Sequence, residues 1–430
     1  MKREKFITAT IIMIIGGFFT KILGMLIRIV ITRLIGLEGI GMYMMVAPTF
    51  NLFIIISQLG VPVAISKLVA EDKKNNKQLI FSILPIIMIF NALMMIIIII
   101  CTPILANHLL KNPKLIYPLL SISIVLPFIT ISNIVRGYFF GKQKIFPHVL
   151  SNNMEQIIRM IAIIIFVPIL YQRGIEYAVS GVVLVNIASE LISIIILIGY
   201  LPKKFKVHKS YFKLNKEYLK DIISVGLPTT ADKIVSSITR FLEPIILTQV
   251  LTAIGYSTNF IVNEYGKLTG YVLPLLLLPS FFAQAISSVL IPVISQNYVK
   301  HQMLYIKNKL KQAILLSFAI GLITTTSLMI KPLLFLNFIY NTNEGVTYLR
   351  ILAPFYLIYY IQLPIASALL AMNRAKEALI NTIKSATIRT VILFSCSYLK
   401  IGVFGLIIAI IVGIITGLYF DYRSLKRILV

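Results

Sequence analysis

The sequence predicts an all-α transmembrane protein of about twelve helices, arranged as two pseudo-symmetric six-helix lobes around a central cavity. Three observations support this class. Of the 430 residues, 58% are hydrophobic and only 13% are charged, whereas a soluble protein has about 25% charged residues. Apolar runs follow one another from Phe6 to Phe420, and each can cross a hydrocarbon core, which needs about 20 helical residues. Lys and Arg gather in alternate breaks between these runs.

The apolar runs define twelve expected spans. They lie at 6–30, 41–66, 79–106, 116–135, 148–170, 177–199, 222–250, 264–297, 312–330, 346–372, 378–399 and 401–420. Of the 41 Lys and Arg residues, 26 fall on the side of the N-terminus and six on the opposite side. The positive-inside rule therefore predicts that both termini are cytoplasmic. The net charge of +26 is then explained by loops beside anionic lipid, and a nucleic-acid partner is not expected.

The longest polar segment divides the chain nearly in half. It runs from Pro202 to Asp221 and is rich in lysine. We predict an N-terminal six-helix lobe over 1–200, a basic cytoplasmic linker over 201–221 and a C-terminal six-helix lobe over 222–430.

The two halves also share a weak internal repeat. Pro62 and Pro292 are 230 residues apart, as are Arg159 and Arg389, while Pro127 and Pro354 are 227 apart. Six predicted helices separate the members of each pair. The lobes should therefore have the same topology, as in parallel repeats related by an axis along the membrane normal.

Charged residues inside the spans are the main functional candidates, because charge in the bilayer is costly. Lys21 and Arg28 are seven apart in the first span and so share one helical face. Asp232, Lys233 and Arg240 lie within the seventh span. We predict that these five residues bind a di-anionic substrate, since Lys and Arg bind phosphate oxygens strongly in low dielectric. The alternative is that they form ion pairs that only lock helices together.

Three further residues are predicted to act in coupling or in structural ion pairs. Glu155 and Arg159 are four apart in the fifth span, a spacing that favours pairing on one helix. Glu264 lies at the start of the eighth span. By contrast, Arg350, Lys384 and Arg389 lie near span ends and are expected to snorkel to the membrane surface.

Motifs for catalysis are not found. The two cysteines, Cys101 and Cys396, both lie in apolar runs and predict neither a disulfide nor a metal site. The sequence has no HExxH, P-loop or nucleophile motif, so we expect no enzyme activity, no cofactor and no ATP hydrolysis. A membrane-bound glycan polymerase or prenyl transferase would need paired carboxylates, and Glu71-Asp72, the one adjacent pair of acids, is expected to lie in a solvated loop.

Several polar breaks resemble one family. Arg136-Gly-Tyr-Phe-Phe-Gly141, followed by Asn153-Met-Glu-Gln-Ile-Ile-Arg159, resembles the fourth-to-fifth-helix signature of the stage V sporulation protein B and polysaccharide flippase family. Thr20-Lys-Ile-Leu-Gly24 and Gly60-Val-Pro-Val-Ala-Ile-Ser66 resemble its first and second helices. The family belongs to the multidrug/oligosaccharidyl-lipid/polysaccharide exporter superfamily, with the lipid II flippases. The chain departs from the usual pattern at Phe140, where Gln is common, and in having about twelve spans instead of fourteen.

The resemblance implies a flippase of the bacterial cytoplasmic membrane that works by alternating access. Its expected cargo is a polyprenyl-pyrophosphate-linked glycan, such as a peptidoglycan or spore-cortex precursor of the cell wall. The expected partners are this lipid-linked glycan, membrane lipids, and a coupling cation or the membrane potential. The alternative is a multidrug cation antiporter of the same fold, which would need an acidic, aromatic-lined cavity.

Overall fold

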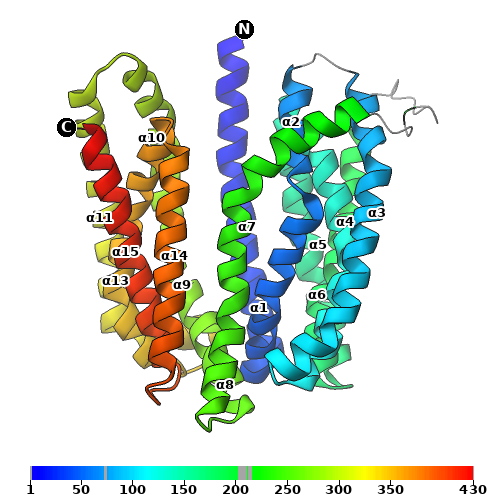
Figure 1. Ribbon diagram of the computed structural model, residues 1–430, viewed down its shortest axis with the longest axis vertical. Coiled ribbons are helices and arrows are strands. Elements are labelled where there is room, and N and C mark those ends of the chain that lie inside the picture. The colour runs from blue at the N-terminus through cyan, green and yellow to red at the C-terminus, as the bar shows by residue number, and fades with distance from the viewer. Residues whose placement is uncertain (1, 72–74, 202–210, 212–215, 430) are drawn as a thin grey trace. The chain divides into compact units, whose positions relative to one another are not determined.

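The computed structural model describes residues 2–71, 75–201, 211 and 216–429 (Figure 1). Within these ranges the regular structure is entirely helical, and no strand is present. The predicted all-α class is confirmed. Asp72 and most of the predicted linker lie outside the described residues, so the solvated loop and the linker at 201–221 stay predictions.

The helices have the following bounds. In the first part of the chain they are α1 (Lys2–Gln58), α2 (Val61–Glu71), α3 (Asn76–Pro103), η1 (Ile104–Leu109), η2 (Pro113–Leu115), α4 (Ile116–Gly141), α5 (Ile145–Tyr171) and α6 (Ile175–Gly199). They continue with α7 (Lys216–Ala253), α8 (Thr258–Gly266), η4 (Lys267–Val272), α9 (Leu273–Leu277), α10 (Ser280–Val299), α11 (Met303–Ile330), α12 (Pro332–Tyr340), α13 (Val346–Ala371), α14 (Ala375–Ser397) and α15 (Phe404–Leu429).

The chain forms two compact units, Met1–Ser237 and Ile238–Val430, and their boundary falls within α7. The first part of α7 belongs to unit 1 because its apolar face is buried there. Ile222 is fully buried in a core that also contains Ile65 of α2, Leu79 of α3 and Phe139 of α4. Tyr218 and Val225 of α7 pack against the same core.

Helix α1 supplies the first predicted span and most of the second. The backbone leaves helical geometry at Gly36, where φ is 65° and ψ is −166°. This is a conformation that glycine adopts without steric cost. The helix then continues to Gln58, so the second predicted span, 41–66, consists of the end of α1 and the start of α2. A turn at Leu59 and Gly60 separates the two helices.

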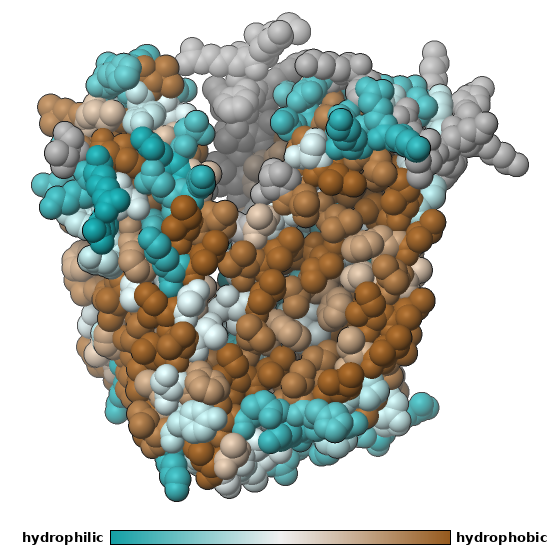
Figure 2. All heavy atoms as spheres, in the orientation of Figure 1, coloured by the Kyte–Doolittle hydropathy of each residue, from teal (hydrophilic) through white to brown (hydrophobic). Residues whose placement is uncertain are grey.

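Among the described residues, nine helices are long and apolar enough to cross a membrane, or ten if a bent pair counts as one span. Two differences separate ten from the predicted twelve. The segment Ile15–Glu71, which joins α1 and α2, counts once but contains two predicted spans, and α14 is too polar to satisfy the criterion. On the face of unit 1 shown in Figure 2, hydrophobic residues cover the middle of the helices and hydrophilic residues lie at their ends. The chain is therefore a multi-pass membrane protein.

The eighth predicted span, 264–297, is broken. It comprises α8, the π-helical segment η4, α9 and α10, with a bend of 48° between Thr258–Leu277 and Ser280–Val299. Two prolines explain the breaks, because proline lacks an N–H and clashes with the preceding turn. Pro274 lies in the first turn of α9, and Pro279 is the N-cap of α10.

Candidate functional site

A buried charged cluster in unit 1 joins α4, α5 and α6. Arg136 of α4 donates from Nη2 to Glu155 of α5, to Glu190 of α6 at 3.2 Å and to the Ser193 hydroxyl at 2.7 Å. Glu155 also accepts from Arg159 on its own helix. Glu155 is 5% exposed and Glu190 is 3% exposed. Two arginines thus face two carboxylates, and the formal charge of this buried cluster, which we call the four-charge cluster, is zero.

The same α4 segment carries two glycines that bring α2 close. A Cβ at Gly137 would lie 2.5 Å from the Pro62 carbonyl oxygen, and one at Gly141 would lie 2.5 Å from the Ser66 carbonyl oxygen. Real Cβ atoms do not approach backbone so closely, so both positions need glycine. The Arg136–Gly141 motif therefore combines an arginine directed at α5 and α6 with a glycine face for α2.

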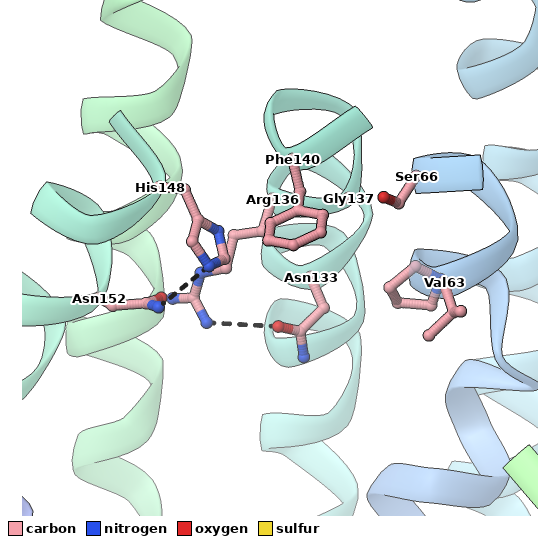
Figure 3. Close-up of a pocket in the computed structure, with 9 residues that line it drawn as sticks. Val63, Ser66, Asn133, Arg136, Gly137, Phe140, His148 and Asn152 are labelled. Carbon is pink, nitrogen blue, oxygen red and sulfur yellow. Dashed lines mark hydrogen bonds between the residues drawn. The ribbon is translucent and has the colours of Figure 1, made fainter. Parts of the chain in front are cut away.

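A pocket of about 310 Å³ lies beside the four-charge cluster, between α2, α4 and α5 (Figure 3). Its lining is mixed. It comprises Pro62, Val63, Ser66, Asn133, Arg136, Gly137, Phe140, His148 and Asn152. In Figure 3 the Arg136 side chain extends from α4 toward His148 and Asn152 of α5. Arg136 Nη1 also donates to Asn133 Oδ1 at 3.3 Å.

Two buried nitrogen atoms of this pocket lack partners. Arg136 Nε and His148 Nδ1 have no hydrogen-bond partner among the described residues. The Asn152 amide nitrogen is 3.4 Å from His148 Nε2, and in this orientation it donates to the ring, which leaves the ring hydrogen on Nδ1. Both free groups are then donors. An acceptor-rich group, such as a phosphate or a sugar oxygen, would satisfy these donors if the lining side chains moved to expose them.

The predicted substrate-binding residues of unit 1 are spread along α1 and α7. Arg28 is half-buried, and its Nη2 lies 3.1 Å from Met44 Sδ. Tyr43 interacts electrostatically with both Arg28 and Arg159. The two arginines therefore lie near the same tyrosine. Lys21 and Lys233 are exposed. The side chain of Asp232, on α7, lies outside the described part of the structure.

In unit 2, Arg240 is exposed and lies close enough to Tyr359 to act on it electrostatically. Its neighbour Glu243 is 8% exposed and pairs with Arg389 of α14. The expectation that Arg389 snorkels to the surface is therefore wrong. A buried acid on α7 is close enough to neutralise it, so the arginine has no need to reach water.

Glu264 lies in a second charged group of unit 2. Its carboxylate accepts from Lys267 at 2.8 Å and from the Tyr348 hydroxyl. Lys267 also pairs with Glu344 at 2.7 Å. This group ties the π-helical segment η4 to the start of α13. The Glu155–Arg159 and Glu264–Lys267 contacts are ion pairs by geometry, and a role in coupling stays a prediction.

Sequence reasoning missed the centre of the four-charge cluster. It ended the fourth span at residue 135 and placed Arg136 in a loop, but α4 continues to Gly141. Glu190 was not among the predicted site residues. The signal for Arg136 was the glycine pair that follows it, since glycines four apart indicate close helix packing and not a loop. His148 carried no signal of its own.

Broken and kinked spanning helices with buried charged groups are typical of membrane transporters. The family follows from the sequence. The family model described as "Polysaccharide biosynthesis protein" matches residues 7–298, and the chain belongs to this family. A second model, MatE, matches residues 244–395.

Two curated relatives from Bacillus subtilis (strain 168) illustrate the similarity. Stage V sporulation protein B is 33% identical over 440 residues, which cover 100% of this chain and 85% of that protein. Lipid II flippase MurJ is 20% identical over 456 residues, which cover 99% of this chain and 83% of that protein. The resemblance to the sporulation and lipid II flippase families is thus confirmed along the whole chain.

Solved structures show the same fold. An inward-facing multidrug resistance MATE family transporter of the MOP superfamily has a TM-score of 0.74 and 16% identity, and the match covers 95% of this chain and 94% of that one. The outward-facing conformation of a multidrug resistance MATE family transporter has a TM-score of 0.63, again with 16% identity, over 99% of this chain and 95% of that one. At this identity the likeness establishes the fold alone.

Proposed function

We propose that this protein is a flippase that carries a polyprenyl-pyrophosphate-linked glycan across the bacterial cytoplasmic membrane by alternating access. The observation that carries the proposal is the full-length similarity to stage V sporulation protein B and to lipid II flippase MurJ. A peptidoglycan or spore-cortex precursor is the proposed cargo. The proposed process is transport, with no covalent step.

The proposed headgroup contacts are the cations of the spans. Lys21, Arg28, Lys233 and Arg240 would supply positive charge for the pyrophosphate, and Asp232 is proposed as a substrate-binding residue beside them in the sequence. The pocket beside Arg136 adds two unpaired donors for phosphate or sugar oxygens. These residues suit an anionic, oxygen-rich cargo because charge-assisted hydrogen bonds strengthen where water is excluded.

We also propose that both termini face the cytoplasm, from the distribution of Lys and Arg. An interior-negative potential would then favour outward movement of an anionic load by ~2.3 kcal/mol per charge per 100 mV. Imposing such a potential on vesicles should accelerate flipping in the outward direction. An unchanged rate would show that the potential does not drive the step.

A vesicle assay tests the function and the site together. The protein is reconstituted with a fluorescent polyprenyl-pyrophosphate disaccharide, and a membrane-impermeant quencher reports the label that has reached the outer leaflet. Arg28→Ala and Arg240→Ala should each lower the rate about tenfold or more, the loss expected for one hydrogen bond to a charged group. Arg173→Ala, at an exposed turn residue, is the control and should leave the rate unchanged.

The outcomes separate function from site. Wild-type flipping at the rate of protein-free vesicles would refute the flippase proposal. Normal flipping by both arginine variants would refute the site while leaving the function. The multidrug cation antiporter remains the second candidate because the MATE transporters share the fold. It would replace the first if the vesicles accumulate an ethidium-like dye and leave the lipid in place.

A further inference from the structure

Unit 2 contains a buried acid that the proposed function does not use. Asp421 of α15 is 6% exposed. It precedes Leu429, the end of the helix, by eight residues, or about 12 Å along the axis at ~1.5 Å per residue. A carboxylate buried at this depth needs compensation, because a charge removed from water is costly.

The two hydrogen-bond partners of Asp421 are neutral and come from α13 and α14. Gln362 of α13 donates from Nε2 to Oδ2 at 3.0 Å, and Asn381 of α14 donates from Nδ2 to Oδ1 at 3.1 Å. Ser424, one turn further along α15, lies 3.1 Å from the same Asn381 nitrogen. These four residues form what we call the Asp421 cluster. Among the described residues no Lys or Arg forms an ion pair with Asp421.

The charged groups on the neighbouring helices are directed elsewhere. Residues 351–371 of α13, which include Gln362, contain no charged residue. On α14, Glu377 pairs with Arg374 at 3.0 Å, and the Lys384 ammonium lies over the Phe420 ring at 5.6 Å from its centre. Lys309 is half-buried and donates to Gln312 at 3.1 Å. Other basic side chains at this end of unit 2 are exposed; they include Lys300, Lys307, Lys311, Lys376, Arg423, Lys426 and Arg427.

The corresponding buried acid of unit 1 is compensated by a cation. Glu190 of α6 and Asp421 are 231 residues apart, and Arg136 and Gln362 are 226 apart, close to the offsets of the sequence repeat. Glu190 forms an ion pair with Arg136 at 3.2 Å. Asp421 instead accepts a hydrogen bond from the neutral amide of Gln362. Removing the cation from such a buried pair leaves the acid uncompensated, and binding of a proton would neutralise it.

We propose that Asp421 is a proton-binding site of unit 2. The carboxylate takes one proton from water and becomes a neutral carboxylic acid, and the reverse step returns that proton to water. The amides suit both forms. Each donates an N–H to the carboxylate as observed, and rotation of one amide by 180° presents its carbonyl oxygen to the new O–H. A cation at the position of Gln362 or Asn381 could stabilise only the ionised form of Asp421, because it has no acceptor for the O–H of the protonated form. This inference goes beyond the proposed function and does not depend on it.

Infrared difference spectroscopy of the full-length protein in lipid nanodiscs tests the proposal without any substrate. Spectra are compared between mildly alkaline and mildly acidic buffer, and the carbonyl stretch of a protonated carboxyl group is followed in H₂O and D₂O. Wild type should gain this band on acidification. Asp421→Asn should lack it, and Glu377→Gln, which removes an exposed acid of the same unit, should retain it.

Two further variants keep the test decisive if Asp421→Asn folds poorly. Asp421→Glu retains a carboxyl group and should keep a band, shifted in position. Gln362→Arg supplies the cation that unit 1 has, and it should lower the proton affinity of Asp421 at least tenfold. The proposal is overturned if the wild-type band is absent, if it persists in folded Asp421→Asn, or if Gln362→Arg leaves the titration unchanged. Suppression of the band by Na⁺ at constant pH would also overturn it in favour of a metal cation.

Discussion

Neutralising Glu155 tests whether the four-charge cluster holds unit 1 together. Glu155 accepts from both Arg136 and Arg159, with their side chains 12% and 19% exposed. In Glu155→Gln, Arg136 keeps its ion pair with Glu190, but Arg159 loses its ion-pair partner and keeps neutral contacts, such as the Gln156 side chain at 3.4 Å. One buried cation is then uncompensated. Breaking a buried pair in this way costs about 3–5 kcal/mol, and we expect the lower end, because Arg159 is not fully enclosed.

A second substitution should recover part of this loss. In Glu155→Gln/Arg159→Gln the remaining Arg136 and Glu190 balance each other, so the double variant should be more stable than Glu155→Gln alone. The coupling free energy between neighbours in one network is typically about 0.5–3 kcal/mol. The free energy of unfolding is measured by SDS titration in mixed micelles, with far-ultraviolet circular dichroism as the readout.

An exposed ion pair of the same unit is the control. Glu38 and Lys114 lie 2.8 Å apart with side chains 45% and 52% exposed, and Glu38→Gln should change stability by less than about 1 kcal/mol. A loss below about 0.5 kcal/mol for Glu155→Gln, or a double variant no better than the single one, would refute the reasoning. The cluster would then not depend on charge balance.

Two further predictions use the same unfolding assay. Gly137→Ala should destabilise unit 1 by about 1–3 kcal/mol, because its Cβ would lie 2.5 Å from the Pro62 carbonyl oxygen, whereas Gly24→Ala meets nothing within 4 Å and should be neutral or slightly stabilising. Equal effects of the two alanines would contradict the close approach of α2 and α4. Glu243→Gln should cost unit 2 about 3 kcal/mol by leaving Arg389 unpaired, and adding Arg389→Gln should recover stability; no recovery would show that the two side chains act independently.

The sequence predicted the fold class well because lipid imposes a simple rule. Every spanning segment must satisfy its own backbone, so apolar runs mark helices directly. The prediction failed at the ends and bends of helices, because this rule does not determine where a helix ends or bends. It could not show that Gly36 only bends the first long helix, or that α4 continues past Arg136, because a charged residue near a span end has the same composition whether it faces water or a buried acid.

The ion-pair partner of a charged residue was harder to predict from the sequence than its position within a span. Glu155 and Arg159 are found in contact, since four residues on one helix fix their distance. The Arg389–Glu243 pair joins residues 146 apart in the sequence, and no local spacing indicates it. The sequence alone could show that Arg389 lies in a span, but the identity of its acid depends on how α7 and α14 pack.

The two units therefore place an arginine at matching points of the repeat and neutralise it in different ways. In unit 1 the acid for Arg159 lies four residues earlier on α5, so the pair survives any rigid movement of that helix. The matching position in unit 2 is Ser385, and the acid for Arg389 comes from α7 instead. Helix α7 is the helix that passes from one unit into the other. A shift of α7 relative to α14 would separate Glu243 from Arg389 and leave two unpaired charges, so this ion pair resists such a shift, whereas the Glu155–Arg159 pair cannot.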